Sequence, residues 1–576
     1  MFRFIAFLGE RSPAAIRFIE EGVESQAWKL AFQDRSIVLL ASHATPLRRC
    51  REGVVVGRAF GSIEAVSGPA LALQNVWGRY VGVWSRGDGG SGGGVVRDPI
   101  GAVPCFLTRA DTCGLAFSHL EDVRGLVGEF ALSKPALCRW LAGEADPSGA
   151  TALQGVAALA PGDQAIWRAK RWETERVWRT GDVVHGKDFS DLSMACAAIR
   201  DAARLVVAAE LDGRDKALLE LSGGLDSSIL AGLIREARPD IELVAITYYA
   251  RDEDSDERPF ARLAAQHAGA RLIEAVADPC EPPLETVLDA PLSPTPCEHV
   301  TALAAPAASE AIACAEGMNA LFAGQGGDHV FHDAQRPWPA ADWMRHNGLG
   351  PGFCAQLRDT VAATRTSYWH ILRATFAAKG FRPTPPESVV RAQRLLGGAV
   401  EAAIGEKQRD PSAQPIDLPP GKQAHARAIE AAEALWAPIG RSERIEIIHP
   451  FLALPVVEAC LRTPVYLLNQ GGRRRSLQRI AFAAHAPPAV LARTRKGGSS
   501  GFNLRVVEAN RDFARALLLK GRLADLGLVE AKAVAGVLQR PAQASGADAA
   551  MMMRLIAAEA WLRALDTWNA QFRERA

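Results

Sequence analysis

The chain contains 576 residues, too many for one ordinary hydrophobic core, so two or more domains are expected. Its 66 Lys and Arg residues are balanced by 65 Asp and Glu residues, for a formal net charge of +1. A charge this small creates no long-range attraction to polyanions, which excludes nucleic acid as an expected partner. No segment has about 18 consecutive uncharged apolar residues, so no membrane insertion is expected either.

The cysteines and the opening residues bear on cellular location. The 10 cysteines are spread along the chain without a C-x-x-C pair or a metal-like cluster, which indicates reduced thiols rather than a disulfide framework. The opening sequence MFRFIAFLGE has too short an apolar run for a signal peptide. We therefore expect a cytoplasmic protein.

Residues 1–185 are predicted to form a β-rich domain. Short apolar or alternating runs such as RSIVLLASH, REGVVVGRAF and GLAFSHL are separated by glycines and charged residues. This pattern is typical of strands joined by turns. It changes after RTGDVVHGKDFSDL, where Ala-rich helical spacing begins, and the second domain is predicted to cover residues 186–576.

The second domain is predicted to be of the α/β class, with a large helical part beyond residue 340. Strands alternate with helices in its first half. The predicted strands are 217–221, 241–249, 271–277 and 318–324, and the predicted helices between them are 226–237, 256–269 and 301–315. Such alternation predicts a parallel sheet with right-handed crossovers, in which ligands bind at the carboxyl ends of the strands.

The stretch LLELSGGLDSSILAGL, residues 218–233, is the strongest local signal for a binding site. It indicates a buried strand, a tight loop and the start of a helix, which directs backbone N–H groups at an anion such as phosphate. The glycines allow the backbone to approach the phosphates, the serines can donate hydrogen bonds, and Asp226 is suited to Mg²⁺. The candidate ligand-binding residues are Leu221, Ser222, Gly223, Gly224, Asp226, Ser227 and Ser228.

Two further segments are expected to lie near this loop. AGQGGDHVF follows the predicted strand 318–324, where Gly324 favours close backbone approach and Asp328 offers a second metal carboxylate. ARTRKGGSSGF places Lys496 before a glycine and serine loop, where it could neutralise a leaving pyrophosphate or a developing tetrahedral intermediate. A solvated charged face is the alternative explanation for the basic run.

At these three segments the chain resembles the asparagine synthetase family, whose SGGxDSS loop belongs to the PP-loop ATP pyrophosphatases. VVRDPIGAVPCFL and LQGVAALAPGDQAIW are similar to stretches of that family's glutaminase domain, and SDERPFARLAAQHAG and HPFLALPVVEACLRTP are similar to its synthetase domain. The resemblance implies an N-terminal Ntn, or class II glutamine amidotransferase-like, domain of the α+β class. It also implies that the second domain is a PP-loop synthetase.

The resemblance further implies ATP and Mg²⁺ as cofactors, activation of a carboxylate as an acyl-adenylate, and attack by an amine to form an amide. On matching positions, Ser222, Gly224, Asp226, Ser227 and Ser228 are implied to hold the pyrophosphate end of ATP. Asp226 and Asp328 are implied to bind Mg²⁺, and Lys496 to support the transition state. Thr247 and Tyr248, at the end of the second predicted strand, are expected near adenine or ribose.

Two departures from the family pattern shape the functional expectation. The family's glutaminase nucleophile is a cysteine directly after the initiator methionine, and this chain has Phe2 there, so the first domain is expected to be catalytically silent. The family's S-G-E-G-x-D-E loop is replaced by one with Gln325 and His329. Gln325 cannot act as a base, whereas His329 is either a general base, a substrate contact or a structural histidine.

A silent glutaminase domain beside an intact synthetase site implies that the amine comes from the substrate. The G-Q-G-G-D-H loop and the long helical insert around residues 335–440 look more like those of lasso peptide macrolactam synthetases. These enzymes join a peptide's N-terminal amine to an Asp or Glu side chain. This resemblance implies a short ribosomal precursor peptide, a leader-binding protein and a leader peptidase as partners. A small-molecule amide or β-lactam synthetase is the alternative, and a non-catalytic nucleotide-binding scaffold is a third.

The insert and the C-terminal region carry tryptophans that could line a peptide cavity, although core packing is their ordinary role. These are Trp338, Trp343, Trp369 and Trp436.

Overall fold

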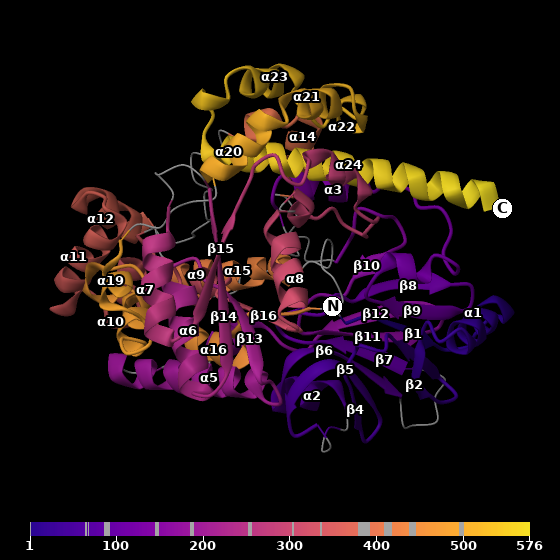
Figure 1. The fold of residues 1–576 in the computed structure, drawn as a ribbon, viewed down its shortest axis with the longest axis horizontal. Helices are drawn as coiled ribbons and strands as arrows, with labels where there is room; N and C mark the ends of the chain where they lie inside the picture. Colours follow the sequence, from indigo (N-terminus) through magenta and orange to yellow (C-terminus); the bar gives the residue numbers. More distant parts are fainter. Residues whose placement is uncertain are drawn as a thin grey trace.

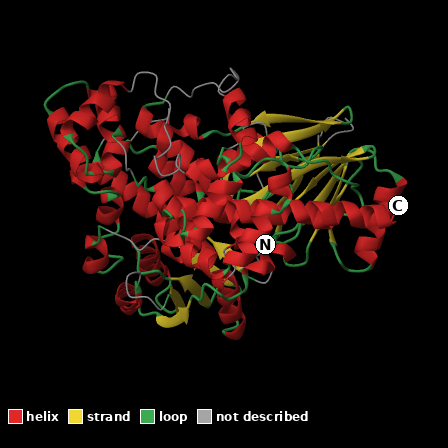
Figure 2. Cartoon of the chain, turned by 90° about the horizontal axis from the view of Figure 1, so that it is seen from above, coloured by secondary structure: helices red, strands yellow, loops and turns green. Residues whose placement is uncertain are grey.

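The structure is a computed structural model, and its parts are shown in Figure 1. It describes residues 2–63, 66, 68–85, 93–144, 149–184, 189, 191–250, 256–301, 304–333, 337–377, 392–407, 418–436, 445–494 and 500–575. Seen from above, the helices gather at one side and most of the strands at the other, with one long helix running between them (Figure 2).

The first part of the chain forms two antiparallel sheets of six strands each. The first sheet has the order β10 (Ala157–Ala158), β8 (Phe106–Ala110), β9 (Cys113–Phe117), β1 (Phe4–Leu8), β3 (Ile37–Ala41) and β2 (Lys29–Gln33). The second has the order β12 (Arg171–Arg176), β11 (Asp163–Arg168), β7 (Gly93–Arg97), β6 (Val76–Ser85), β5 (Gly53–Gly61) and β4 (Leu47–Cys50). The prediction of a β-rich first domain is confirmed.

Strand β1 shows why these sheets are buried on both faces. Side chains alternate across a strand, so Phe4, Ala6 and Leu8 point one way and Ile5 and Phe7 the other. The first set packs between the two sheets, and the second set packs against helices on the outer face of the first sheet. Because both faces are covered by apolar groups, all five residues of β1 are fully buried.

The second part of the chain contains a five-stranded parallel sheet, as the alternating pattern predicts. Its order is β15 (Arg271–Val276), β14 (Glu242–Tyr249), β13 (Lys216–Glu220), β16 (Ala320–Ala323) and β17 (Glu446–Ile448). The four predicted strands are present within a few residues of their expected bounds. The edge strand β17 was not predicted, because three residues are too short for a periodic signal.

Helices cover both faces of this sheet, which explains why its strands are apolar on both sides. One face packs against α5 (Leu192–Leu211), α6 (Leu225–Ala237) and α7 (Arg258–Ala268), and the other against α8 (Ala304–Ala315). In β13, Leu219 faces the first group and Leu218 faces α8. The predicted parallel-sheet α/β domain is therefore confirmed.

The remaining helices lie around these sheets. Those packed against the first domain are α1 (Pro13–Glu24), α2 (Pro69–Asn75) and α3 (Lys134–Leu141), whereas α4 (Thr180–Val184) packs in the core of the second domain. Those of the helical insert and the site are α9 (Gly327–Val330), α10 (Trp338–Asn347), α11 (Gly352–Thr364), α12 (Tyr368–Ala377), α14 (Gly398–Lys407), α15 (Pro420–Ala431), α16 (Leu454–Leu461), α17 (Val465–Leu468), α18 (Ser476–Ala481) and α19 (Pro488–Ala492). The C-terminal helices are α20 (Ser500–Ala509), α21 (Arg511–Leu519), α22 (Arg522–Asp525), α23 (Ala531–Gln539) and α24 (Gly546–Arg575).

Helix α24 returns to the first domain and lies over the outer face of its first sheet (Figure 1). Phe117 and Ile5 share one apolar cluster with Met552 and Leu555 of this helix. The Trp568 indole donates a hydrogen bond to the Gly128 carbonyl at 3.1 Å. The apolar cluster on the outer face of the first sheet is thus completed by residues more than 400 positions later in the chain.

A buried ion network joins the two parts of the chain. Arg58 and Arg79 come from β5 and β6, and Glu446 comes from β17. Glu446 accepts hydrogen bonds from Arg58 Nε at 3.0 Å, from Arg79 Nη2 at 2.8 Å and from Arg214. Arg79 Nη2 also donates to both carboxylate oxygens of Glu210, at 2.9 and 2.7 Å. Burial alone would raise the pKa of Glu446, but the three arginines lower it to about 2.

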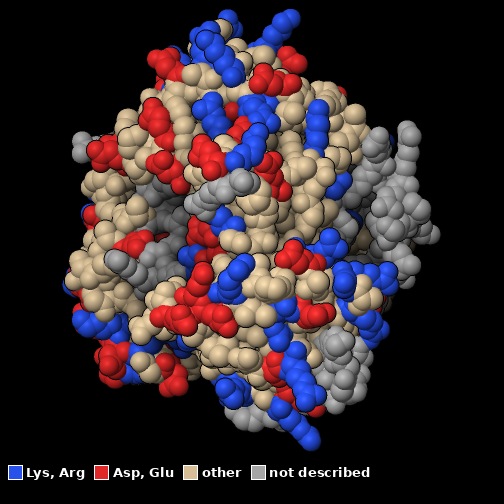
Figure 3. Space-filling model, turned by 90° about the vertical axis from the view of Figure 1, so that its right-hand side faces the viewer, with Lys and Arg blue, Asp and Glu red and all other residues tan. Residues whose placement is uncertain are grey.

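On the face seen in Figure 3, basic and acidic side chains are mixed, and no large area carries charge of a single sign. This agrees with the near-zero net charge of the chain. None of the helices in the described ranges has both the length and the apolar character needed to cross a bilayer.

Candidate active site

The glycine-rich loop lies between β13 and α6, at the carboxyl end of a central strand. Gly223 has φ of 69°, in the left-handed region that glycine adopts without strain. A Cβ atom here would lie 2.6 Å from the Ala261 nitrogen of α7, so the close packing of the loop on that helix also requires glycine. Arg493 braces the loop from outside, donating to the Gly223 carbonyl at 3.0 Å and to Glu257.

Some hydrogen-bonding groups of this loop are not fully paired with other groups of the described chain. Helix α6 begins after Gly224 with no side-chain cap, so its first-turn N–H groups remain available to an anion. The Ser222 and Ser227 hydroxyls are 3.2 Å apart. The Ser228 hydroxyl is buried and has no hydrogen-bond partner within the described residues. Such donors match the predicted role in binding phosphate.

The loop that follows β16 packs directly onto the first loop. A Cβ atom on Gly324 would lie 2.6 Å from the Ser227 nitrogen, and one on Gly327 would lie 2.3 Å from Asp226 Oδ1. Only glycine therefore permits this approach. The two segments that the sequence analysis placed at neighbouring strand ends are thus brought together, and Leu221 lies in the core beneath them.

Gly324→Ala tests whether this close approach matters. The added methyl group must push the backbone of the two loops apart, so we expect ATP affinity to fall by about tenfold, equivalent to about 1.4 kcal/mol. Isothermal titration calorimetry with ATP measures the change. Gly536→Ala in α23, where a Cβ atom would meet nothing within 4 Å, is the matched control. Unchanged ATP affinity in both variants would show that the two loops do not form one binding site.

Asp226 is buried and is held by two residues of the segment that ends in α18. Arg475 Nη1 donates to both of its carboxylate oxygens, at 3.0 and 2.8 Å, and Gln478 Nε2 donates to Oδ1 at 2.7 Å. The Gln478 side-chain oxygen is buried without a partner among the described residues. Burial alone would lower the pKa of Arg475, but Asp226 and neighbouring aspartates raise it, which keeps this guanidinium charged.

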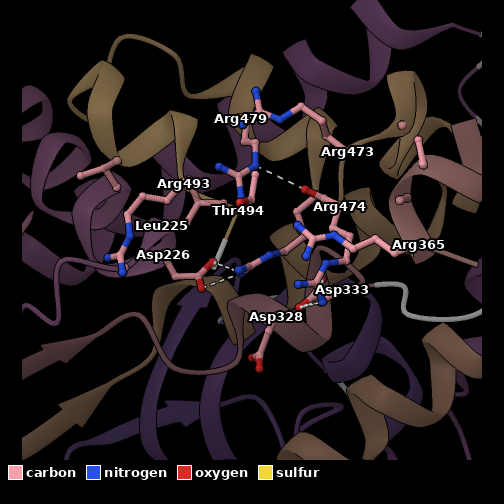
Figure 4. A pocket seen from close by; sticks show the side chains of 16 residues that line it. Leu225, Asp226, Asp328, Asp333, Arg365, Arg473, Arg474, Arg479, Arg493 and Thr494 are labelled. Carbon is pink, nitrogen blue, oxygen red and sulfur yellow. Dashed lines mark hydrogen bonds and ion pairs between the residues drawn. The ribbon is translucent and has the colours of Figure 1, made fainter. Parts of the chain in front are cut away.

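A cavity of about 250 Å³ opens beside the first turn of α6 (Figure 4). Arginines dominate its wall and outnumber the aspartates by six to three. The arginines are Arg365, Arg473, Arg474, Arg475, Arg479 and Arg493, and the aspartates are Asp226, Asp328 and Asp333. Burial and the adjacent Arg473 and Arg475 lower the pKa of Arg479 to about 10, which reflects the local excess of positive charge. A cavity of this kind attracts anions.

Asp328 lies at the start of α9 and is more exposed than Asp226, with 59% of its side-chain surface accessible. Its carboxylate points away from the arginines in Figure 4 and pairs with His329 Nδ1 at 3.0 Å. That hydrogen bond raises the pKa of His329, although burial opposes it. A raised pKa increases the protonated fraction at neutral pH, and a protonated imidazole cannot accept a proton.

The other residues singled out from the sequence lie elsewhere. Thr247 is buried in β14. The Tyr248 hydroxyl is 2.5 Å from that of Ser309 on the α8 face, and burial raises the pKa of Tyr248. Neither residue lines the cavity, and Gln325 is exposed. Lys496 lies outside the described residues, so its role stays a prediction.

None of the four tryptophans lines the arginine cavity. Trp338 and Trp436 are buried, and Trp343 packs against Tyr466 with ring centroids 5.0 Å apart. Trp369 is 81% exposed. The positions of the two buried tryptophans match the ordinary alternative of core packing.

The N-terminal part of the chain offers no nucleophile at Phe2. This side chain packs with the apolar cluster between the two sheets. Its Cδ2 atom would lie 3.1 Å from a Cβ atom placed on Gly57 of β5. A phenylalanine ring in this position fills space and cannot form a covalent intermediate.

The residues around the cavity fit Mg²⁺ in complex with a phosphate ligand. Asp226 and Asp328 both contribute to the wall, the buried Gln478 oxygen and Ser228 hydroxyl lack partners, and Gly327 leaves room against Asp226. In the described part of the chain, no group of three or more His, Cys, Asp or Glu side chains forms a metal site by itself. Mg²⁺ usually takes one or two carboxylates and completes its shell with water and substrate phosphates.

Together these features place the chain among α/β proteins that bind phosphate groups at the carboxyl ends of a parallel sheet. Comparison with known families narrows this class. The asparagine synthase profile matches residues 198–563, and because the match spans more than half of the chain, the chain belongs to the asparagine synthase family. Its members are ATP-dependent amide-forming ligases that use Mg²⁺.

Comparison with curated proteins found no match. Two solved structures with similarity to the chain were compared. One, described as the allosteric regulatory enzyme of purine biosynthesis, is 12% identical, with 48% of this chain and 82% of that chain covered and a TM-score of 0.20. The other, glutamine phosphoribosylpyrophosphate amidotransferase from B. subtilis with ADP and GMP, is 10% identical, with 48% and 81% covered and a TM-score of 0.19. Scores of this size carry no argument about this chain.

Sequence reasoning missed the residues that surround Asp226 on the far side of the cavity. Arg475 and Gln478 lie in RRRSLQR, the start of a stretch, RRRSLQRIAFAAHAPPAVLARTRKGG, that resembles the family's synthetase domain, but the resemblance assigned no role to either residue. Their partner is about 250 positions earlier, and no local pattern reports such a contact. The basic run and this resemblance were the signals available.

Proposed function

We propose that this protein is a lasso peptide cyclase. It uses ATP to adenylate an Asp or Glu side-chain carboxylate of a short ribosomal precursor peptide, with release of pyrophosphate. The peptide's N-terminal amine then attacks the acyl-adenylate, forming the amide and releasing AMP and a proton. A leader-binding protein and a leader peptidase are its proposed partners, because the amine must be freed before the ring can close.

The observation that carries the proposal is the combination of an open phosphate site with a phenylalanine, Phe2, at the position of the family's cysteine nucleophile. The uncapped α6 N-terminus and the loop hydroxyls supply donors for ATP phosphates. Phe2 stands where the family has its cysteine nucleophile, which supports an amine carried by the substrate over ammonia from glutamine.

The roles proposed for the chain's residues are supported by their described positions, except for Lys496, whose proposed role rests on the family resemblance alone. Ser222, Ser227 and Ser228 bind the phosphates, and the arginine wall holds the pyrophosphate as it leaves. Asp226 and Asp328 would hold Mg²⁺, which when bound neutralises phosphate charge. Lys496 is proposed to stabilise charge in the transition state, and His329 to contact the amine or act as its base.

Intact-mass analysis tests the proposal. A leader-free candidate precursor with a free N-terminal amine and an internal Asp or Glu is incubated with this protein, its peptidase partners and ATP-Mg²⁺. We expect the peptide to lose the mass of one water, with a fragmentation gap over the N-terminal ring. Asp226→Ala serves as the inactive control. An unchanged peptide mass, with AMP and pyrophosphate formed on free amino-acid derivatives, would contradict the proposal.

A small-molecule amide or β-lactam synthetase is the second candidate. The family match supports it equally, because that match establishes ATP-dependent amide formation without specifying a peptide substrate. Under this candidate the substrate carboxylate and amine belong to one amino-acid derivative rather than to a peptide. Turnover of such a derivative by this protein, without partner proteins, distinguishes the two.

A further inference from the structure

We infer that Arg475 makes cation binding at Asp226 conditional on nucleotide. In the protein without nucleotide, the Arg475 guanidinium is hydrogen-bonded to the Asp226 carboxylate. When nucleotide binds, its phosphates bind the guanidinium instead and free the carboxylate. A divalent cation therefore binds together with the nucleotide and not before it. The inference rests on the ATP site proposed above, but it concerns the order of binding and is independent of which amide is made.

The hydrogen bonds of Asp226 distinguish a permanent partner from an exchangeable one. Gln478 donates to Oδ1 at 2.7 Å, is fully buried and is not part of the cavity wall. Arg475 donates to Oδ1 at 3.0 Å and to Oδ2 at 2.8 Å, and it does line the cavity. Among the described residues, Arg475 is the only donor to Oδ2. When Arg475 leaves, Gln478 still orients the carboxylate while Oδ2 becomes available to a cation.

The charges around the cavity explain why an anion is needed for this exchange. A cation arriving alone would have to push Arg475 into a space whose wall already carries five other arginines. That displacement moves a charged group toward like charges with no compensating anion. Phosphate groups reverse the balance, because a guanidinium binds phosphate through two parallel hydrogen bonds and Asp226 then gains the cation as its new partner.

The backbone of Arg475 is fixed, so only its side chain has to move. Arg475 has φ of 53° and ψ of 38°, a left-handed conformation that is unusual for a residue other than glycine. Its backbone nitrogen donates to Asn469 Oδ1 at 3.0 Å, and Asn469 is itself buried and bonded to the His332 carbonyl at 3.3 Å. Strained residues held in this way are frequent at functional sites. The geometry also makes glycine a compatible replacement.

Electron paramagnetic resonance of Mn²⁺ provides the test, because free Mn²⁺ gives a signal that decreases on binding. The full-length protein is titrated with Mn²⁺ in the absence of nucleotide, and again with a non-hydrolysable ATP analogue. Because the analogue itself binds Mn²⁺, the same titration of the analogue without protein sets the baseline. For the wild type we expect binding only with the analogue. Arg475→Gly is expected to bind Mn²⁺ without nucleotide at least about tenfold more tightly than the wild type. Arg475→Asn, which also tolerates the left-handed conformation, is a second variant should the first fail to fold.

Two further variants control this test. Lys170→Gly removes a cationic side chain from another left-handed position, with φ of 59°, on an exposed residue between β11 and β12 that is not part of the cavity wall. It is expected to bind Mn²⁺ only with the analogue, as the wild type does. Adding Asp226→Asn to Arg475→Gly is expected to abolish the nucleotide-independent binding.

The outcomes separate this inference from the proposed function. Equal Mn²⁺ affinity of the wild type with and without the analogue would overturn the conditional role of Arg475. So would Arg475→Gly and Arg475→Asn proteins that are folded and yet bind no more tightly than the wild type without nucleotide. Failure of the wild type to bind the ATP analogue at all would instead overturn the proposed ATP site.

Discussion

Asp226→Asn is expected to slow pyrophosphate release by on the order of a thousandfold, because the change removes the charge that would hold Mg²⁺ against the phosphates. Asparagine keeps the shape of the side chain and can still accept a hydrogen bond from Arg475 or Gln478. The fold should therefore survive, which alanine does not ensure. A coupled pyrophosphate assay with ATP and the peptide substrate measures the rate.

Asp215→Asn is the matched control for this experiment. The Asp215 side chain is 99% exposed, lies at the opposite end of β13 from the glycine-rich loop, and is not part of the cavity wall. Its replacement is expected to leave the rate unchanged. An Asp226→Asn protein that is folded and retains a rate close to that of the wild type would contradict the assignment of this carboxylate to the reaction.

The second large effect is expected on the free energy of unfolding, and it comes from the buried ion network between the two parts of the chain. Glu446→Gln leaves Arg58 and Arg214 without their carboxylate partner and Arg79 with Glu210 alone, and losing one member of a buried pair costs about 3–5 kcal/mol. The folded-state pKa of Glu446 is about 2, below the ordinary glutamic acid pKa of 4.5, so its stabilising contribution is present above about pH 4.5 and is lost as the pH falls toward 2. Urea unfolding at pH 7 is therefore expected to show a larger difference between wild type and variant than urea unfolding at pH 3.

A surface ion pair provides the control for the network. Glu242 pairs with Lys216 at 3.0 Å across two strands, and about half of each side chain is exposed. Glu242→Gln is expected to change the free energy of unfolding by less than about 1 kcal/mol at both pH values. If the Glu446 variant lost the same stability at pH 3 as at pH 7, ionisation of this carboxyl would not be the cause.

The central part of the second domain could be predicted from the sequence because its signals are local. Apolar strand runs, helical spacing and turn residues recur within about 60 residues of one another, from β13 to β15. The glycine-rich loop could be predicted for the same reason. Gly223, Gly224 and Asp226 follow one another in the chain, and the structure keeps them between a strand and a helix.

The features that could not be predicted from the sequence depend on contacts between segments that are far apart in the chain. Nothing near Asp226 in the sequence indicates that Arg475 and Gln478 will bind it, because that contact is made by the folding of α18 against the first loop. The same applies to β17, a three-residue strand that is stabilised by pairing with β16 and not by its own pattern. Likewise, the Tyr248 side chain points toward Ser309 because α8 covers that face of the sheet.

Helix α24 has a consequence for biosynthesis. The apolar cluster on the outer face of the first sheet, which includes Ile5, Phe7 and Phe117, is completed only when this helix adds Met552 and its neighbours, yet β1 leaves the ribosome more than 500 residues earlier than Met552. The N-terminal half cannot finish folding while the rest of the chain is being translated, and in that interval it presents an apolar sheet of the kind that chaperones bind. A chain that stops before Gly546 should accumulate in the insoluble fraction of the cell, even though every residue of both antiparallel sheets has been made.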